Sequence, residues 1–131
     1  MILSDTSFIV ATIRADDQNH HRCITALGNI RTSLLTTWPC ITEAMHLLGP
    51  QGKETLREQI EQGVLTLHTV SQQHAERACS LMRTYEDAPM DFADASLVVA
   101  AEDYGTTDIL TLDRHFYAYL IHGTTAFTVR P

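Results

Sequence analysis

Apolar and polar positions along the chain follow two alternating patterns. Short apolar stretches predict strands near residues 2–3, 34–37, 64–70, 109–112 and 126–129. Between them, apolar residues recur at the spacing of amphipathic helices, at 8–13, from near Asp16-Asp17 to 30, at 39–48, 53–62, 71–85 and 90–104. Pro39 suits the first turn of a helix, and Gly49-Pro50, Gly63 and Gly105 are placed to end helices.

This alternation of strands with helices is typical of an α/β domain with a mainly parallel sheet. Right-handed crossovers would place helices on both faces of about five strands. No repeat, low-complexity tract or linker divides the chain, so residues 1–131 are expected to form a single domain. Ligand sites in such sheets form outside the carboxyl ends of the strands, which gives each acidic residue a positional test.

Composition and charge narrow the class of protein. The 131 residues carry sixteen Asp plus Glu against nine Lys plus Arg, for a net charge of −7, which argues against a protein that coats duplex DNA through a basic face. Cys23, Cys40 and Cys79 are widely spaced, so neither a disulfide framework nor a thiolate metal site is expected. The absence of a basic leader and of a long apolar run predicts a cytoplasmic protein without membrane contact.

Four acidic residues occupy unusual positions. Asp5 and Asp113 each follow a predicted strand, at its carboxyl end, whereas Glu43 and Asp94 lie among apolar residues of predicted helices. A carboxylate in such surroundings is costly unless it is paired or binds a metal. Lys and Arg are too few nearby to pair all four, and oxygen donors favour Mg²⁺ or Mn²⁺ over Zn²⁺.

Each acid also has an ordinary structural interpretation. Asp5 would cap a helix or start an Asx turn, Asp91 and Asp94 would form a capping pair, and Asp113 would lie in a surface turn. Glu43 would be exposed if its helix were rotated. The adjacent histidines His20-His21 project to different sides of a helix, so they make a poor metal chelate and are better explained as surface residues.

Four segments together resemble the PIN domain, and within it the VapC-like toxin ribonucleases of toxin–antitoxin pairs. They are Leu3-Ser-Asp-Thr-Ser, Thr42-Glu-Ala, Met90-Asp-Phe-Ala-Asp-Ala-Ser-Leu and Leu110-Thr-Leu-Asp-Arg-His-Phe. The resemblance implies a PIN-like α/β/α sandwich, with Asp5, Glu43, Asp94 and Asp113 as metal ligands. Supporting roles are expected for Thr6, Ser7, Asp91 and Thr111. The chain departs from the family pattern at His115, where a further acid is common, which suggests either a phosphate contact or an exposed neutral histidine.

The activity implied by the resemblance is metal-dependent hydrolysis of RNA. Water would attack phosphorus in line and leave a 5′-phosphate and a 3′-hydroxyl. Single-stranded or structured RNA would enter the cleft, with flanking phosphates held by some of Arg14, Arg31, Arg114 and Arg130. The family also implies an antitoxin encoded by an adjacent gene and a homodimer.

Three alternatives remain open at this point. The chain could be a PIN nuclease of RNA processing without an antitoxin, or a PIN-like binding module without activity, although the latter would be expected to lose acids. A receiver-like phospho-acceptor domain needs an acidic pair after its first strand, an Asp after its third and a Lys near its end. Asp5 stands alone, the 64–70 stretch ends without an Asp, and Lys53 is the one lysine, so that alternative is disfavoured.

Overall fold

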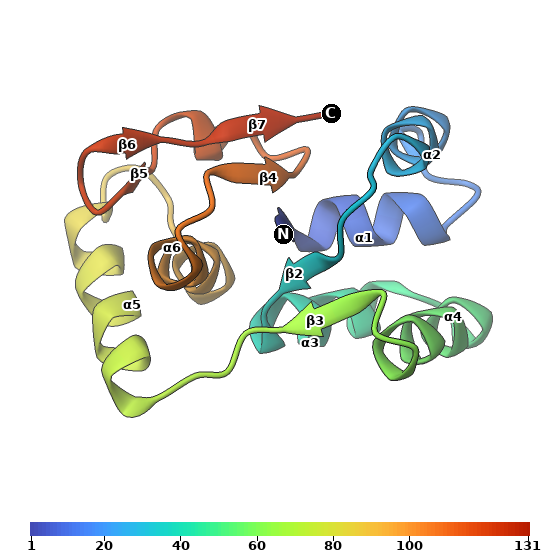
Figure 1. Ribbon diagram of the computed structural model, residues 1–131, viewed down its shortest axis with the longest axis horizontal. Coiled ribbons are helices and arrows are strands. Elements are labelled where there is room, and N and C mark those ends of the chain that lie inside the picture. The colour runs from blue at the N-terminus through green and yellow to red at the C-terminus, as the bar shows by residue number, and fades with distance from the viewer.

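Five strands form one parallel sheet in the computed structural model of the chain, which describes residues 1–131 (Figure 1). In sheet order they are β3 (Leu65–Leu67), β2 (Leu34–Thr36), β1 (Ile2–Ser4), β4 (Asp108–Leu110) and β7 (Thr128–Arg130). On the central strand β1, Ile2 lies opposite Leu34, and Leu3 lies opposite both Leu35 and Ile109. The predicted α/β class with a parallel sheet is therefore confirmed.

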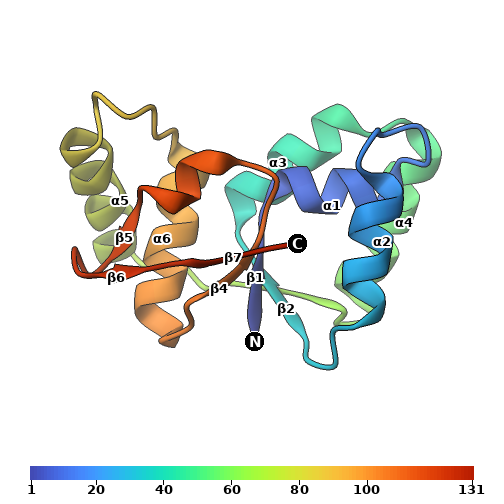
Figure 2. The ribbon, with the colours of Figure 1, turned by 90° about the horizontal axis from the view of Figure 1, so that it is seen from above.

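Six helices cover the two faces of the sheet (Figures 1 and 2). One face carries α5 (Gln72–Thr84) and α6 (Phe92–Tyr104). The other side carries α1 (Thr6–Ile13), α2 (His20–Gly28), α3 (Trp38–Leu47) and α4 (Pro50–Glu61). The result is the sandwich of helices, sheet and helices that the sequence predicted.

The alternation of side chains along each strand explains the two layers of core. Leu35 and Ile109 belong to the hydrophobic cluster beneath α5 and α6, whereas their neighbours Leu34 and Leu110 belong to the cluster on the other face. Successive side chains of a strand point to opposite faces. Because both faces are buried, these strands are short continuous apolar runs rather than alternating ones.

Several predicted boundaries were wrong. The second helix begins at His20 rather than near Asp16, because Asp17 accepts the backbone N–H of Asn19 at 2.8 Å in a turn. The fourth begins at Pro50 rather than Lys53, since a proline that stops one helix also suits the first turn of the next. The 64–70 stretch is a strand only at Leu65–Leu67.

The C-terminal region differs most from expectation. A single strand was predicted at 126–129, but β6 (Thr125–Ala126) pairs with β5 (Leu120–Ile121) in a small antiparallel hairpin, and β7 then joins the main sheet. A 3₁₀ helix, η1 (Arg114–Tyr117), precedes the hairpin. Elements of two to four residues are too short to show periodicity, so the sequence pattern contained no signal for them.

The strand order creates one crevice at the carboxyl edge of the sheet. From β1 the chain adds β2 and then β3 on one side, and β4 and β7 on the other. The order therefore reverses between β1 and β4, the kind of position where open α/β sheets bind ligands. None of the helices is both long and apolar enough to span a bilayer.

Candidate active site

Asp5 connects the two central strands at the point where the strand order reverses. It follows β1 and is the N-cap of α1, and its Oδ1 accepts the Thr6 backbone N–H at 2.7 Å. Its Oδ2 accepts the hydroxyl of Thr111, which follows β4, also at 2.7 Å. The Asp5 side chain is thus both a helix cap, as the structural interpretation predicted, and part of a network that reaches across the sheet.

Asp5 is only 6% exposed, and burial raises the pKa of its carboxyl group. The Thr111 hydroxyl and the Thr6 N–H act in the opposite direction by stabilising the charged form, and the charge of Asp113 raises the pKa further. No lysine or arginine contributes to this balance. The carboxylate is therefore held in place by neutral donors and lacks a counter-charge from the chain.

Two hydroxyls shape the segment that carries Asp113. The Thr111 Oγ1 accepts the Asp113 backbone N–H at 2.9 Å, and the Ser7 Oγ accepts the Leu112 backbone N–H at 3.0 Å. Ser7 also lies 3.4 Å from Oδ2 of Asp5. Both residues thus tie the end of β4 to the start of α1.

Asp91 and Asp94 form a reciprocal capping box at the start of α6. The Asp91 Oδ1 accepts the backbone N–H of Asp94 at 2.8 Å, and the Asp94 Oδ2 accepts that of Asp91 at 3.2 Å. Asp94 nevertheless has its pKa raised to about 7, first by burial and then by the charges of Asp91, Asp5 and Asp113. Asp94 therefore caps α6 and is also repelled by the charges of the neighbouring acids.

Glu43 lies on α3, where its side chain is half-buried. Burial raises the pKa of its carboxyl group, the charges of Asp91 and Asp5 raise it further, and the Thr6 hydroxyl opposes the rise. Thr6 is itself held by the backbone oxygen of Cys40, to which its hydroxyl donates at 3.2 Å. Glu43 thus belongs electrostatically to the same group of acids as Asp5 and Asp94.

Asp113 caps η1 and pairs with a histidine. Its Oδ1 accepts the His115 backbone N–H at 2.9 Å and lies 2.8 Å from the His115 Nδ1. The His115 side chain is half exposed, in line with the exposed histidine expected at this departure from the family pattern. This contact occupies one carboxylate oxygen, and no lysine or arginine forms an ion pair with any of the four acids.

A cleft of about 410 Å³ opens between the start of α6 and η1. It is lined by Glu86, Pro89, Met90, Asp91, Asp94, Asp113 and His115, with no lysine or arginine among them. Asp5 is buried more deeply, yet its charge raises the pKa of Asp94. A group of carboxylates that repel one another, without lysine or arginine beside them, is the donor set that a hard divalent cation would neutralise.

The predicted arginines separate into two groups. Arg114 lines a cavity of about 300 Å³ that shares Asp113 with the acidic cleft, and Arg130 lines a neighbouring cavity while lying 3.5 Å from Asp108. Arg14 pairs with Asp16 at 2.8 Å, and Arg31 donates to the Gly28 carbonyl at 3.0 Å. Neither Arg14 nor Arg31 lines these cavities.

Sequence reasoning missed two residues of this region. Arg22, on α2, lines both cavities beside the cleft, and the Tyr119 hydroxyl donates to the Pro89 carbonyl and lies 3.4 Å from Asp94 Oδ2. Tyr119 lies 25 positions from Asp94 and Arg22 lies far before Asp113 along the chain. Residues this far apart along the chain leave no local pattern in the sequence. Only the packing of the helices and strands shows that Arg22 and Tyr119 lie in this region.

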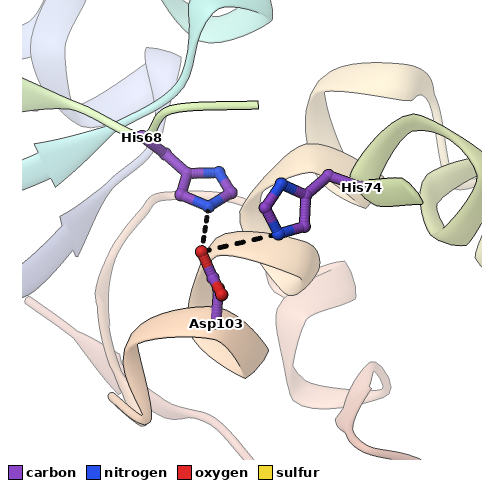
Figure 3. A group of neighbouring side chains, drawn as sticks. All are labelled: His68, His74 and Asp103. Atoms are coloured by element: carbon purple, nitrogen blue, oxygen red, sulfur yellow. Dashed lines mark hydrogen bonds and ion pairs between the residues drawn. The ribbon is translucent and has the colours of Figure 1, made fainter. Parts of the chain in front are cut away.

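A different group of candidate metal ligands lies near the far end of α6 (Figure 3). The Nε2 of His68 donates to Asp103 Oδ2 at 2.8 Å, and the Nε2 of His74 lies 3.5 Å from the same oxygen. The His74 Nδ1 accepts the backbone N–H of Ser71 at 3.0 Å, so its Nε2 carries the proton and faces Asp103. These contacts link the three side chains to one another at the other end of α6 from the acidic cleft, and we assign the group to stability rather than to the cleft.

Comparison with known proteins agrees with this architecture. The family model described as PIN domain matches residues 2–119. Ribonuclease VapC26 of Mycobacterium tuberculosis (strain ATCC 25618 / H37Rv) is 28% identical over 135 residues, which cover 99% of this chain and 100% of that protein.

Solved structures share the fold at lower identity. The sarcin-ricin loop cleaving toxin VapC20 of Mycobacterium tuberculosis superposes with a TM-score of 0.84 at 20% identity, covering 90% of this chain and 94% of that one. A toxin–antitoxin complex from Klebsiella pneumoniae gives 0.65 at 19% identity, over 88% and 90% of the two chains. FitAcB from Neisseria gonorrhoeae gives 0.62 at 20% identity, over 98% and 97%. With the family model spanning all four acidic positions, the chain belongs to the PIN domain family.

Proposed function

We propose that the chain is an endoribonuclease that requires Mg²⁺ or Mn²⁺ and acts as the toxin of a toxin–antitoxin pair. The observation that carries the proposal is the set of four carboxylates, Asp5, Glu43, Asp94 and Asp113. Burial and charge repulsion raise the pKa of the first three, and Asp94 and Asp113 line a cleft without lysine or arginine. The names of relatives support the same conclusion, because one is a ribonuclease and another is a toxin that cleaves the sarcin-ricin loop.

The four carboxylates would hold one or two divalent cations. When bound, such cations supply the charge that neutralises a phosphoryl group in transit and lower the pKa of water. Asp5 and Asp113 would bind from the ends of the two central strands, and Asp94 and Glu43 from two helices. Thr111 would fix the orientation of the Asp5 carboxylate, because its hydroxyl donates to Oδ2.

The chain itself contributes positioning to hydrolysis. Without a bound cation Asp94 has a pKa of about 7, so a cation that binds it near neutral pH would displace a proton from its carboxyl group. The attack of water on phosphorus breaks the bond to the 3′ oxygen and yields a 5′-phosphate and a 3′-hydroxyl. No serine, threonine or cysteine needs to act as a nucleophile, which agrees with the use of Ser7 and Thr111 as hydrogen-bond partners of the acids.

The partner we propose is an antitoxin encoded by an adjacent gene. The Klebsiella pneumoniae structure is described as a toxin–antitoxin complex, and its fold matches this chain. An antitoxin that carries a basic side chain into the acidic cleft would supply the counter-charge that the chain lacks. A homodimer of the toxin is part of the same proposal.

Cleavage of total RNA by the purified protein tests the function directly. With Mg²⁺ or Mn²⁺ we expect cuts at defined positions that carry 5′-phosphate ends, and with EDTA we expect none. Asp5→Asn and Asp94→Asn should each abolish cutting, while a variant of an exposed arginine that does not line the cleft, Arg83→Ala, should cut like the wild type. Cutting in EDTA, or full activity of either acid variant, would refute the proposed site.

A further inference from the structure

A basic cavity adjoins the acidic cleft, and Asp113 lines both. The basic cavity has a volume of about 300 Å³, within the range of sites that bind small molecules or single nucleotides. Its lining includes Arg22 from α2, and Arg114 and Tyr117 from η1. An RNA strand in the cleft at Asp113 would therefore have two arginine side chains in the cavity beside it.

Neither arginine of this cavity pairs with an acidic side chain. Arg22 donates one hydrogen bond, at 3.3 Å, to the main-chain oxygen of Pro131, and Arg114 makes no ion pair. Four of the six other arginines do pair with a carboxylate: Arg14, Arg57, Arg77 and Arg130. The remaining two are Arg31 and Arg83. In a protein with a net charge of −7, two guanidinium groups that line one cavity without an acidic side-chain partner, beside the single carboxylate of Asp113, offer a local anion site.

Tyr117 adds an aromatic surface to the same cavity. Its side chain is 66% exposed, the most exposed of the large apolar residues, whereas its neighbours Phe116 and Tyr119 are fully buried. An exposed ring contributes little to the core. A ring beside two phosphate-binding groups is the arrangement that single-stranded nucleic acids use, with a base on the aromatic face and phosphates on the cations.

We propose that this cavity binds the single-stranded RNA segment next to the scissile phosphate, with Arg22 and Arg114 on phosphates and a base stacked on Tyr117. The inference deepens the proposed nuclease function and rests on it for the position of the scissile phosphate. An acidic peptide would also meet the two arginines. RNA is favoured because the cavity continues into the cleft at Asp113, and because a stacking ring lies beside the cations.

The experiment measures RNA binding separately from cleavage. A short fluorescent single-stranded RNA of mixed sequence is titrated, with Mg²⁺ present and at several salt concentrations, into protein silenced by Asp94→Asn. Further substitutions are Arg22→Gln, Arg114→Gln and Tyr117→Ala, all at exposed positions that should not disturb folding. The matched control is Arg83→Ala, an exposed arginine of α5 without an ion pair.

Each arginine substitution should reduce the slope of log K against log salt concentration by about 0.7, the value for one phosphate contact on a single strand. Lysine at either position should restore the slope, because it keeps the charge. Tyr117→Ala should weaken binding about fivefold or more and leave the slope unchanged, because stacking releases no counterions. Arg83→Ala should bind like its parent.

Two results would overturn the cavity assignment. One is an unchanged slope in both arginine variants, and the other is a poly-glutamate peptide that binds as tightly as the RNA. The outcomes also separate this inference from the proposed function. Wild-type protein that leaves total RNA intact, while the arginines still set the binding slope, would refute the nuclease and leave the cavity. If the wild type cleaves RNA normally but none of the three substitutions changes RNA binding, the assignment of the cavity would be refuted and the nuclease function would not.

Discussion

Replacing Asp94 with asparagine should stabilise the protein when no divalent cation is present. The pKa of Asp94 is raised from 3.8 to about 7, mainly by burial and by the charge of Asp91. At a pH between these two pKa values, Asp94 keeps its proton in the folded protein, whereas the unfolded chain has released it. Stability of the wild type therefore falls as the pH rises from about 4 to about 7, and the loss is complete above that window.

The size of the effect follows from the shift. One pKa unit corresponds to about 1.4 kcal/mol, so the full shift would correspond to about 4 kcal/mol. The carboxylate is only half-buried, and water screens part of the repulsion, so we expect about 1–2 kcal/mol. For a domain of this size that raises the melting temperature by about 3–8 °C. Asparagine keeps an oxygen that accepts the Asp91 N–H, so the cap of α6 should survive.

Melting curves in EDTA, recorded by circular dichroism from about pH 4 to about pH 8, provide the assay. The advantage of Asp94→Asn should grow across this range and level off at its upper end. Mg²⁺ should reverse the order, because ligand at a hundredfold excess over its Kd stabilises the wild type by about 2.7 kcal/mol and the variant less. A variant that is no more stable at the upper pH, or equally more stable at every pH, would refute the electrostatic argument.

Three further predictions concern neighbouring features. Thr111→Val removes the hydroxyl that Asp5 accepts, so Mg²⁺ affinity measured by calorimetry should fall about 10–100-fold; an unchanged affinity would contradict the positioning role. Asp103→Asn should lower the melting temperature above about pH 4, because His68 holds the pKa of Asp103 below its usual range. RNA cleavage should be unchanged, and a loss of cleavage would link the group of His68, His74 and Asp103 to the active site. Native protein should show one fast-reacting thiol by mass spectrometry, that of exposed Cys79, whereas the thiols with raised pKa should react only after unfolding: Cys23 and Cys40.

The sequence allowed the acidic site to be predicted because each acid has a local signature. Asp5 directly follows β1, and Asp113 follows the apolar stretch 109–112, although the strand β4 itself ends at Leu110. Glu43 and Asp94 interrupt apolar helix faces. Parallel strands then bring their carboxyl ends to one edge without any further information. The helix caps were predictable for the same reason, because a cap involves residues only a few positions apart.

The basic side of the site lacked such a signature. Arg22 lines the same cavity as Asp113 only because α2 packs on α1 and the C-terminal strand β7 joins β4 at the edge of the sheet. The small hairpin and η1 that position Tyr117 are too short to show periodicity. Tertiary contacts of this kind depend on the assembled fold, so neither composition nor spacing could identify the residues.

The distribution of charge gives the net acidity a specific meaning. Asp113 lies between a cleft without lysine or arginine and a cavity with two arginines that have no acidic side-chain partner, so the phosphates of an RNA strand would meet repulsion on one side and attraction on the other. Divalent cations would remove the repulsion, while salt would screen the attraction. Metal dependence and salt dependence of RNA binding should therefore be separable. Substitution of the acids would change the metal dependence of RNA binding, and substitution of the arginines would change its salt dependence. A protein with a uniformly acidic surface would not show two separate effects.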